Sequence, residues 1–214
     1  MRIHNVLPEE EGEVHRVYRL LKSWILEGRV RPGEFLSEVE LARQCETSRT
    51  PVREACNLLS QEKWIQRIRH KGYVIPPISV PDIIEVYEYR KVLECFNAER
   101  TASDGTHEEL QSLRDIVTVE DDPSADMIRF LETNQQFHLR LAEIARNQRI
   151  VEQLQLTLEY VKRLDILTSQ KDTRPVSHRE IMRAIEARNS RKAARAMAEH
   201  IHISRDQMLR VFGT

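Results

Sequence analysis

The chain has 214 residues, of which 40% are hydrophobic and 31% charged, and its formal net charge is −1. This composition excludes wholesale disorder, and only 6% aromatic residues beside abundant Leu, Ala and Arg favours helices. No stretch approaches the roughly 20 apolar residues that cross a bilayer, and the first residues lack the apolar segment of a signal peptide. Three cysteines without CxxC spacing indicate neither a disulfide framework nor a cysteine zinc site. We therefore expect a cytoplasmic protein that does not bind membranes.

The charges are unevenly distributed along the chain. Residues 1–78 contain 13 Lys and Arg against 11 Asp and Glu, and residues 79–214 contain 20 against 23. Residues 49–72 carry a local net charge of +4. DNA binding requires such cation clusters, but a solvated basic face would have the same composition. Charge alone leaves both interpretations open.

A run of prolines divides the chain. Pro76, Pro77 and Pro81 fall within six residues, which neither a helix nor a central strand can accommodate. The run predicts a linker between a first domain over 1–78 and a second over 79–214.

The first domain begins with a predicted pair of helices. Apolar residues at helical spacing predict a helix over 13–27, and Gly28 is placed to end it. Ser37 and Glu40 have the spacing of a capping box, which predicts the start of a second, short helix.

A third helix and a hairpin complete this domain. Ser48 can cap the third helix, with Pro51 in its first turn. The runs 64–68 and 73–75 alternate in polarity or are rich in β-formers, and Gly72 between them permits a tight turn. The order of helix, helix, turn, helix and hairpin predicts a winged helix-turn-helix.

In that fold, the first turn of the third helix enters the major groove of DNA. Arg49 and Arg53 project from one face of this turn, and arginine is the commonest bidentate reader of guanine. Hydroxyls and free N–H groups at the helix start can hold a phosphate, and the hairpin tip can reach an adjacent groove. The candidate DNA-binding residues are Ser48, Arg49, Thr50, Arg53, Lys71 and Gly72. The alternative is an ordinary helical hairpin with surface arginines.

Two ordered motifs in this region resemble the GntR family of bacterial transcription regulators. They are PGEFLSEVELA, residues 32–42, and SRTPVREA, residues 48–55, and Gly72-Tyr73-Val74 is similar to the family's wing. The resemblance covers about residues 13–78. It implies that Arg49, Thr50 and Arg53 contact DNA, with backbone contacts at Ser48 and Gly72. Val39 departs from the pattern, since some members carry an arginine there that contacts a base or phosphate.

The second domain reads as helical throughout. Ser79 with Asp82 and Thr106 with Glu109 have the spacing of helix caps, and Pro123-Ser124 and Pro175 lie near further helix starts. The apolar stripes of successive segments predict an antiparallel bundle of about six helices. The complete expectation is a mainly α protein, with one small β-hairpin in its N-terminal winged helix-turn-helix.

Polar residues interrupt three of the apolar stripes. Helical spacing directs Asn134 and His138 into the bundle from one helix, His178 from another and His200 from the last, whereas His202 faces outward. Three neutral imidazoles suit Zn, Ni, Fe or Cu and leave an open coordination position. Any one of these histidines alone could instead be a hydrogen-bonded core residue.

Residues 79–214 are similar to the FadR C-terminal domain, the helical effector-binding domain of one GntR subfamily. The motifs are NQQFH ending at His138, SHREI around His178 and EHI around His200, with YRKVLE in the opening helix. The resemblance implies a divalent transition metal, zinc or nickel, and a small carboxylate or sugar acid bound beside it. Asn134 stands where a metal-binding member usually has aspartate, and an amide oxygen is a weaker ligand than a carboxylate. Metal binding is therefore retained, or is weakened or absent if Asn134 is a poor ligand.

Arg90 is the candidate to meet the negative charge of the effector, because it lies in the buried stripe of the opening helix. A salt bridge with Glu94, four residues later, is an equally good interpretation of Arg90.

Together these features predict a sequence-specific transcription regulator, not an enzyme, that binds a double-stranded DNA operator and an organic acid effector. A homodimer is expected, because helix-turn-helix dimers read two-fold-related operators. The alternative from another class is a metal-dependent hydrolase that uses the three histidines, although no HExxH motif is present. A third interpretation is an architectural DNA-binding protein that binds no effector.

Overall fold

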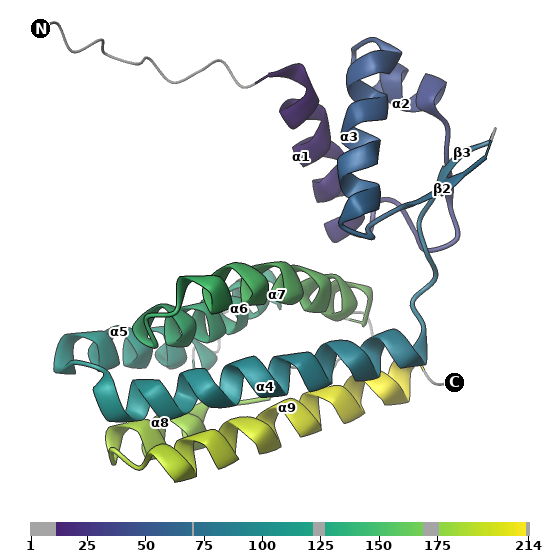
Figure 1. The fold of residues 1–214 in the computed structure, drawn as a ribbon. Coiled ribbons are helices and arrows are strands. Elements are labelled where there is room, and N and C mark those ends of the chain that lie inside the picture. The colour runs from purple at the N-terminus through teal and green to yellow at the C-terminus, as the bar shows by residue number, and fades with distance from the viewer. Residues whose placement is uncertain (1–11, 70, 122–126, 169–175, 213–214) are drawn as a thin grey trace, which may run out of the picture. The chain divides into compact units, whose positions relative to one another are not determined.

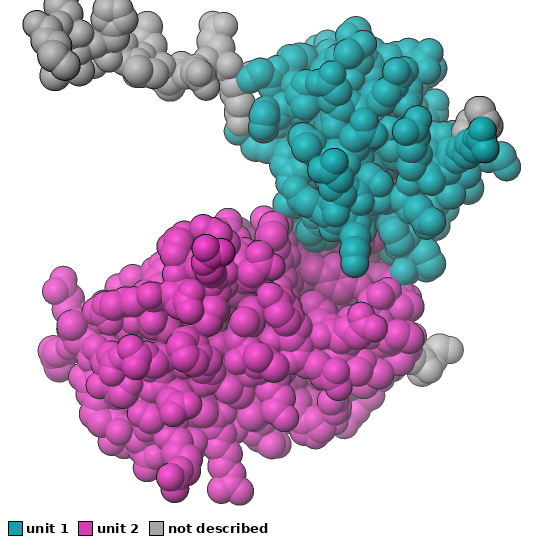
Figure 2. All heavy atoms as spheres, viewed as in Figure 1, with its two compact units in different colours: residues 1–77 teal, residues 78–214 magenta. Residues whose placement is uncertain are grey.

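The computed structural model describes residues 12–69, 71–121, 127–168 and 176–212 (Figure 1). The chain divides into two compact units, residues 1–77 and 78–214 (Figure 2). The predicted fold class is confirmed: over the described residues the protein is mainly helical, with one small antiparallel sheet in the first unit. Among these residues, no helix combines the length and apolar character needed to cross a bilayer.

The first unit packs its helices over one apolar core. Its elements are α1 (Glu13–Leu26), β1 (Phe35–Leu36), α2 (Glu38–Gln44), α3 (Arg49–Gln61), β2 (Gln66–Ile68) and β3 (Gly72–Val74). The buried face of α1, with Val17, Leu21 and Ile25, lies against the buried face of α3, with Val52 and Leu59. This packing fixes α3 as a rigid element whose other face is exposed.

The predicted hairpin is present and acquires a third strand. β3 pairs antiparallel with both β2 and β1, so the strand order is β1-β3-β2. The sequence analysis did not predict β1, because two residues are too few to show an alternating pattern. Gly72 is required by this sheet: its φ is +106°, and a Cβ atom there would overlap the carbonyl oxygen of Leu36.

The predicted side-chain caps form only in the second unit, and Ser48, like Ser37, makes no side-chain cap bond. The predicted end of the first helix is confirmed, since Gly28 follows α1 with a φ of +70°. Ser79 accepts a hydrogen bond from the backbone N–H of Asp82, and Thr106 and Glu109 form a complete capping box. The predicted Ser37–Glu40 box is wrong, since Ser37 occupies the N-cap position without a side-chain cap bond. The carboxylate of Glu40 pairs with Arg43 and accepts from Gln44 instead.

The second unit is the predicted helical bundle. Its elements are α4 (Val80–Asp104), α5 (His107–Thr118), the 3-10 turn η1 (Val119–Asp121), α6 (Met127–Ile144), α7 (Gln148–Thr168), α8 (Arg179–Glu186) and α9 (Ser190–Phe212). α4 and α9 are the long helices of the unit and lie side by side in antiparallel directions (Figure 1). The predicted helix starts at Pro123–Ser124 and Pro175 lie outside the described residues.

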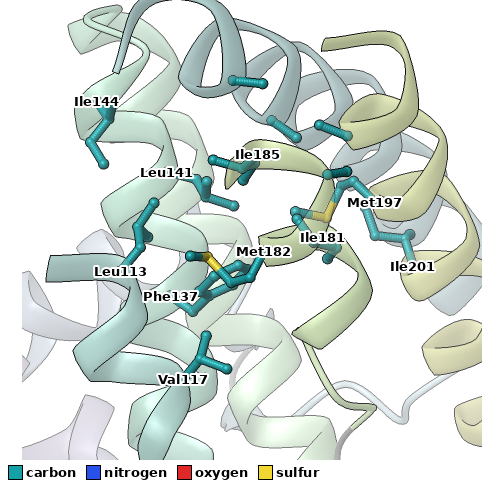
Figure 3. Packing of buried hydrophobic residues seen from close by; sticks show 14 of the residues in the cluster. Leu113, Val117, Phe137, Leu141, Ile144, Ile181, Met182, Ile185, Met197 and Ile201 are labelled. Carbon is teal, nitrogen blue, oxygen red and sulfur yellow. The ribbon is translucent and has the colours of Figure 1, made fainter. Parts of the chain in front are cut away.

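The core of the bundle is made by the inward stripes of α4, α5, α6, α8 and α9, with Leu164 from α7. Phe137 and Leu141 of α6 meet Ile181 and Ile185 of α8 and Met197 of α9 (Figure 3). Such apolar burial stabilises the fold by about 25 cal/mol per Å² removed from water. Polar side chains buried in this interior therefore need hydrogen-bond or ionic partners.

Candidate functional site

A charged groove opens on the surface of the first unit. It lies between the N-terminal ends of α2 and α3 and the β2–β3 wing, and its cations are Arg49, Arg53, Arg67 and Lys71. The side chains of Arg49 and Arg53 are 58% and 51% exposed. The first turn of α3 therefore presents both guanidinium groups to solvent from one face, as the spacing predicted.

The remaining predicted DNA-binding residues surround the same groove. Ser48 is the exposed N-cap residue of α3 and makes no side-chain cap bond, so its hydroxyl is available to a phosphate. Thr50 is exposed one residue into the helix, and Lys71 and Gly72 line the groove from the wing. Val39 also lines it and is exposed.

Two groove residues were missed by the sequence analysis. Arg67 of β2 belongs to the basic segment 49–72, but no motif distinguished it from the other cations there. Glu38, the first residue of α2, forms ion pairs with both Arg49 and Arg53. Glu38 lies outside residues 49–72, the segment whose local charge was counted, so that count did not identify it.

The second site is a cluster of three histidines inside the helical bundle. His138, His178 and His200 are 0%, 1% and 4% exposed, and each offers a ring nitrogen within 4.8 Å of the others. They come from α6, from the residue preceding α8 and from α9. The convergence of three helices on one point is the arrangement that the helical spacing predicted.

One detail of that prediction needs correction. His178 does not lie within a helix but is the N-cap residue of α8, so its ring enters the bundle from the helix end. Asn134 lies one turn before His138 on α6 and is half-buried. The structure brings the three histidines together, and a ligand role for Asn134 stays a prediction.

Buried carboxylates hold two of the histidine rings. Nδ1 of His138 contacts Glu94 of α4, and Nδ1 of His178 contacts Glu120 of η1. Glu120 also accepts hydrogen bonds from the hydroxyl of Ser177, at 2.8 Å, and from the backbone N–H of His178. A carboxylate at Nδ1 favours the tautomer with its proton there, which leaves an unprotonated Nε2 on each ring. Sequence reasoning found neither glutamate, because each acts across helices that are distant in sequence.

The geometry of these nitrogens fits a metal ion. Nε2 of His138 lies 3.3 Å from Nε2 of His178, so two lone pairs face each other in a dry interior. Two nitrogens bound tetrahedrally at roughly 2.0–2.1 Å from zinc lie about 3.3–3.4 Å apart. Nδ1 of His200 is buried and has no hydrogen-bond partner. A shared cation would relieve both of these unfavourable features.

Arg90 contacts the same cluster. Its side chain is 2% exposed, and its Nε donates to Glu94 at 2.7 Å, which is the alternative salt bridge considered from the sequence. Its Nη2 also lies 3.4 Å from Nε2 of His138. Although burial opposes ionisation, Arg90 and His138 lower the pKa of Glu94 to about 2, so this carboxylate is charged at neutral pH.

Desolvation dominates the charge states of His138 and His200. Burial lowers the pKa of His138 to about 4, against the opposing effect of Glu94, and burial also lowers the pKa of His200. Both rings are therefore neutral at physiological pH, the state in which an imidazole ligates a metal.

Two family models match the chain, one in each unit. Residues 13–75 match "Bacterial regulatory proteins, gntR family", and residues 85–202 match the "FCD domain". The chain is 29% identical over 186 residues to the Nta operon transcriptional regulator of Aminobacter aminovorans, which covers 85% of this chain and 87% of that protein. It is 28% identical over 210 residues to the HTH-type transcriptional repressor RspR of Escherichia coli, covering 94% and 91%.

Solved structures share the fold. E. coli McbR/YncC superimposes with a TM-score of 0.74 at 18% identity, over 94% of this chain and 99% of that one. A putative transcriptional regulator GntR from Rhodococcus sp. RHA1 gives a TM-score of 0.66 at 24% identity, over 92% and 97%. The two sequence relatives are named as transcriptional regulators, and none of the comparisons supports the hydrolase alternative. The chain belongs to the GntR family of bacterial transcriptional regulators that carry a C-terminal FCD domain.

Proposed function

We propose that this regulator reads its operator with the first turn of α3 and responds to a small organic acid bound at the histidine cluster. The exposed pair Arg49 and Arg53 in a cationic groove is the observation that carries the DNA-reading assignment. A bidentate guanidinium contact discriminates against a wrong base by about 1–3 kcal/mol. Ser48, Thr50, Lys71 and the backbone at Gly72 position the unit on the phosphates.

The effector site is assigned to the three histidines and Arg90. The facing Nε2 atoms of His138 and His178 and the unpartnered Nδ1 of His200 support a divalent metal there, with zinc or nickel as the first candidates. Such an ion supplies a Lewis-acidic position for a carboxylate oxygen. Arg90 adds a fixed positive charge at the same cluster and requires no proton transfer to keep it. Asn134 contributes no formal charge, so binding is expected to be weaker than at a site with aspartate in that place.

The assembly expected from this chemistry is a homodimer on a two-fold-related operator. A helix-turn-helix dimer places two recognition helices about one helical turn of DNA apart. An effector that prefers one arrangement of the two reading heads changes operator affinity by its differential binding energy, typically about 1–3 kcal/mol. A regulator of this kind acts in the bacterial cytoplasm, where the thiols of Cys45, Cys56 and Cys95 remain free.

Selection of duplexes from a random DNA pool by the purified protein tests the proposal. A shared sequence motif with inverted symmetry is expected among the bound duplexes. The selected duplex is then titrated with the protein in the presence of candidate carboxylates and sugar acids, before and after removal of metal with a chelator. Failure to enrich any motif would contradict the DNA-reading assignment. An effector response that survives both chelation and the His178→Ala substitution would contradict the assignment of the effector site.

A further inference from the structure

Among the described residues that line the groove of the first unit, one carboxylate, Glu38, lies among the cations. Glu38 begins α2, and its side chain is 15% exposed, whereas those of Arg49 and Arg53 are 58% and 51% exposed. Glu38 therefore lies deeper in the groove than the two guanidinium groups that it contacts. Although burial opposes its ionisation, the hydrogen bonds from Arg53 and Arg49 lower the pKa of Glu38, so the carboxylate is charged at neutral pH.

These contacts restrain Arg49 and Arg53 but use only some of the N–H groups of each guanidinium. Nη2 of Arg49 lies 3.1 Å from Oε2 of Glu38, and Arg53 approaches both carboxylate oxygens, at 3.4 Å through Nε and 3.3 Å through Nη2. A guanidinium has five N–H donors in a rigid planar fork. Each arginine therefore keeps N–H groups with which it can meet a base edge.

The position of Glu38 opposes binding to the DNA backbone. The other charged residues of the groove, Arg67 and Lys71 beside the two arginines, are all cations. A carboxylate among them repels phosphates of any sequence and neutralises part of the attraction on which non-specific binding depends. In return, it orders two flexible side chains before they meet DNA, which lowers the entropy lost on binding.

We propose that Glu38 is a positioning residue for sequence specificity: it orients the Arg49 and Arg53 forks toward base edges and weakens binding to DNA of other sequences. The inference rests on the proposed reading role of the two arginines. It differs from a direct readout role, in which the carboxylate would accept a hydrogen bond from cytosine. The depth of Glu38 beneath both guanidinium groups favours the positioning role.

The test compares two duplexes of equal length, the one that the wild-type protein selects from a random pool and one of scrambled sequence. Dissociation constants are measured by fluorescence anisotropy at several salt concentrations. For Glu38→Gln, the dissociation constant for the selected duplex should rise about tenfold, because the arginine forks are no longer ordered. That for the scrambled duplex should fall about twofold to fivefold, and its salt dependence should steepen by about one released ion.

Two further variants separate positioning from charge and from folding. Glu38→Asp keeps the charge but cannot span both arginines, so it should lose affinity for the selected duplex and leave the scrambled duplex unchanged. Glu40→Gln removes the same charge two residues away, where it pairs with Arg43 outside the arginine pair, and should leave the ratio of the two affinities unchanged. A Glu38→Gln protein that retains the wild-type ratio, or that loses affinity equally for both duplexes, would overturn the inference.

Direct readout has its own signature: the selected motif would change at a single cytosine position in Glu38→Gln, whereas positioning broadens the preference at the bases read by both arginines. A change confined to one cytosine would therefore overturn the positioning role. If the wild-type protein selects no motif at all, the proposed DNA-reading assignment itself fails. That result is distinct from one in which the motif exists and Glu38 does not affect it.

Discussion

At the scale of single residues, the candidate functional side chains of both sites are held by a neighbouring carboxylate. Arg49 and Arg53 are held by Glu38, and His138 and His178 by Glu94 and Glu120. The neighbour orients the functional side chain in each case, and the surface groove and the buried cluster differ mainly in solvent exposure. Substitutions of these glutamates therefore test the two sites as directly as substitutions of the arginines and histidines that they contact.

The arginine assignment predicts the effect of Arg49→Ala. Loss of one bidentate base contact should weaken binding to the selected duplex by about 1–3 kcal/mol and relax the preference at one base position. Arg43→Ala is the matched control, because Arg43 is an exposed arginine of the same unit that pairs with Glu40 outside the groove. Anisotropy titrations check both variants. Equal losses for the two would contradict the assignment of Arg49.

The holding role of Glu120 predicts a weaker metal site in Glu120→Gln. The apparent affinity for zinc, measured by competition with a chromogenic chelator, should fall about tenfold to a hundredfold, as for other second-layer carboxylates on metal-bound histidines. Glu180→Gln is the control, because Glu180 is exposed and pairs with Arg183 on the same helix. Asn134→Asp should raise the affinity by adding a carboxylate next to the cluster. Unchanged affinity in Glu120→Gln would mean that His178 does not need this partner.

At the scale of elements, two helix starts have the same capping-box pattern in the sequence, but only one of them forms the side-chain cap bonds. The capping box of Thr106 and Glu109 forms as predicted, because one carboxylate oxygen of Glu109 accepts from the backbone N–H of Thr106 while the other pairs with Arg146. The spacing of Ser37 and Glu40 is identical, but the glutamate pairs with Arg43 and the serine side chain makes no cap bond. An equal sequence pattern therefore does not predict an equal energetic contribution.

This difference can be measured with two alanine substitutions. Thr106→Ala removes a real cap and should lower the free energy of unfolding of the helical unit by about 0.5–2 kcal/mol. Ser37→Ala removes a hydroxyl without a cap bond and should change stability by only a few tenths of a kcal/mol, about the size of an ordinary surface substitution. Urea denaturation followed by circular dichroism provides the comparison. A larger loss in Ser37→Ala than in Thr106→Ala would contradict the assignment of the caps.

At the scale of the whole molecule, the helical unit buries several charged and polar groups within its apolar core. Arg90, Glu94 and the three histidines are buried there, and Asp165 of α7 contributes a further carboxylate whose pKa burial raises to about 7, although Arg90 opposes this. Burying such groups opposes folding unless each is paired. We interpret the unfavourable free energy of burying these groups as the consequence of keeping a preformed binding site.

Asp165 makes the destabilisation caused by buried ionisable groups dependent on pH. Its pKa in the folded protein lies above the value of about 3.9 for an unperturbed aspartate, so ionisation destabilises the folded state as pH rises from about 4 to 7. Asp165→Asn removes that destabilisation and should stabilise the protein at pH 8, by at most about 4 kcal/mol for a pKa raised by about three units, with little effect at pH 4. Thermal melts at the two pH values, on chelated protein, check the sign. Equal stabilisation at both would show that ionisation is not the cause.

The sequence by itself determined the features that depend on local pattern. Helical spacing and the proline run were enough to predict a winged helix-turn-helix followed by a helical bundle, and the spacing of Arg49 and Arg53 placed both on one exposed face. The same periodicity directed His138 and His200 inward, because it states which way a side chain points from its own helix axis.

Only the tertiary structure decided which inward-pointing groups meet. That Glu94 faces His138, that Glu120 faces His178 across the start of α8, and that β1 pairs with the wing depends on how segments distant in sequence pack. Glu38 meets Arg49 and Arg53 for the same reason, since α2 and α3 pack across a turn. Periodicity fixes a direction within one element, whereas the partner in that direction is chosen by the close packing of all elements at once.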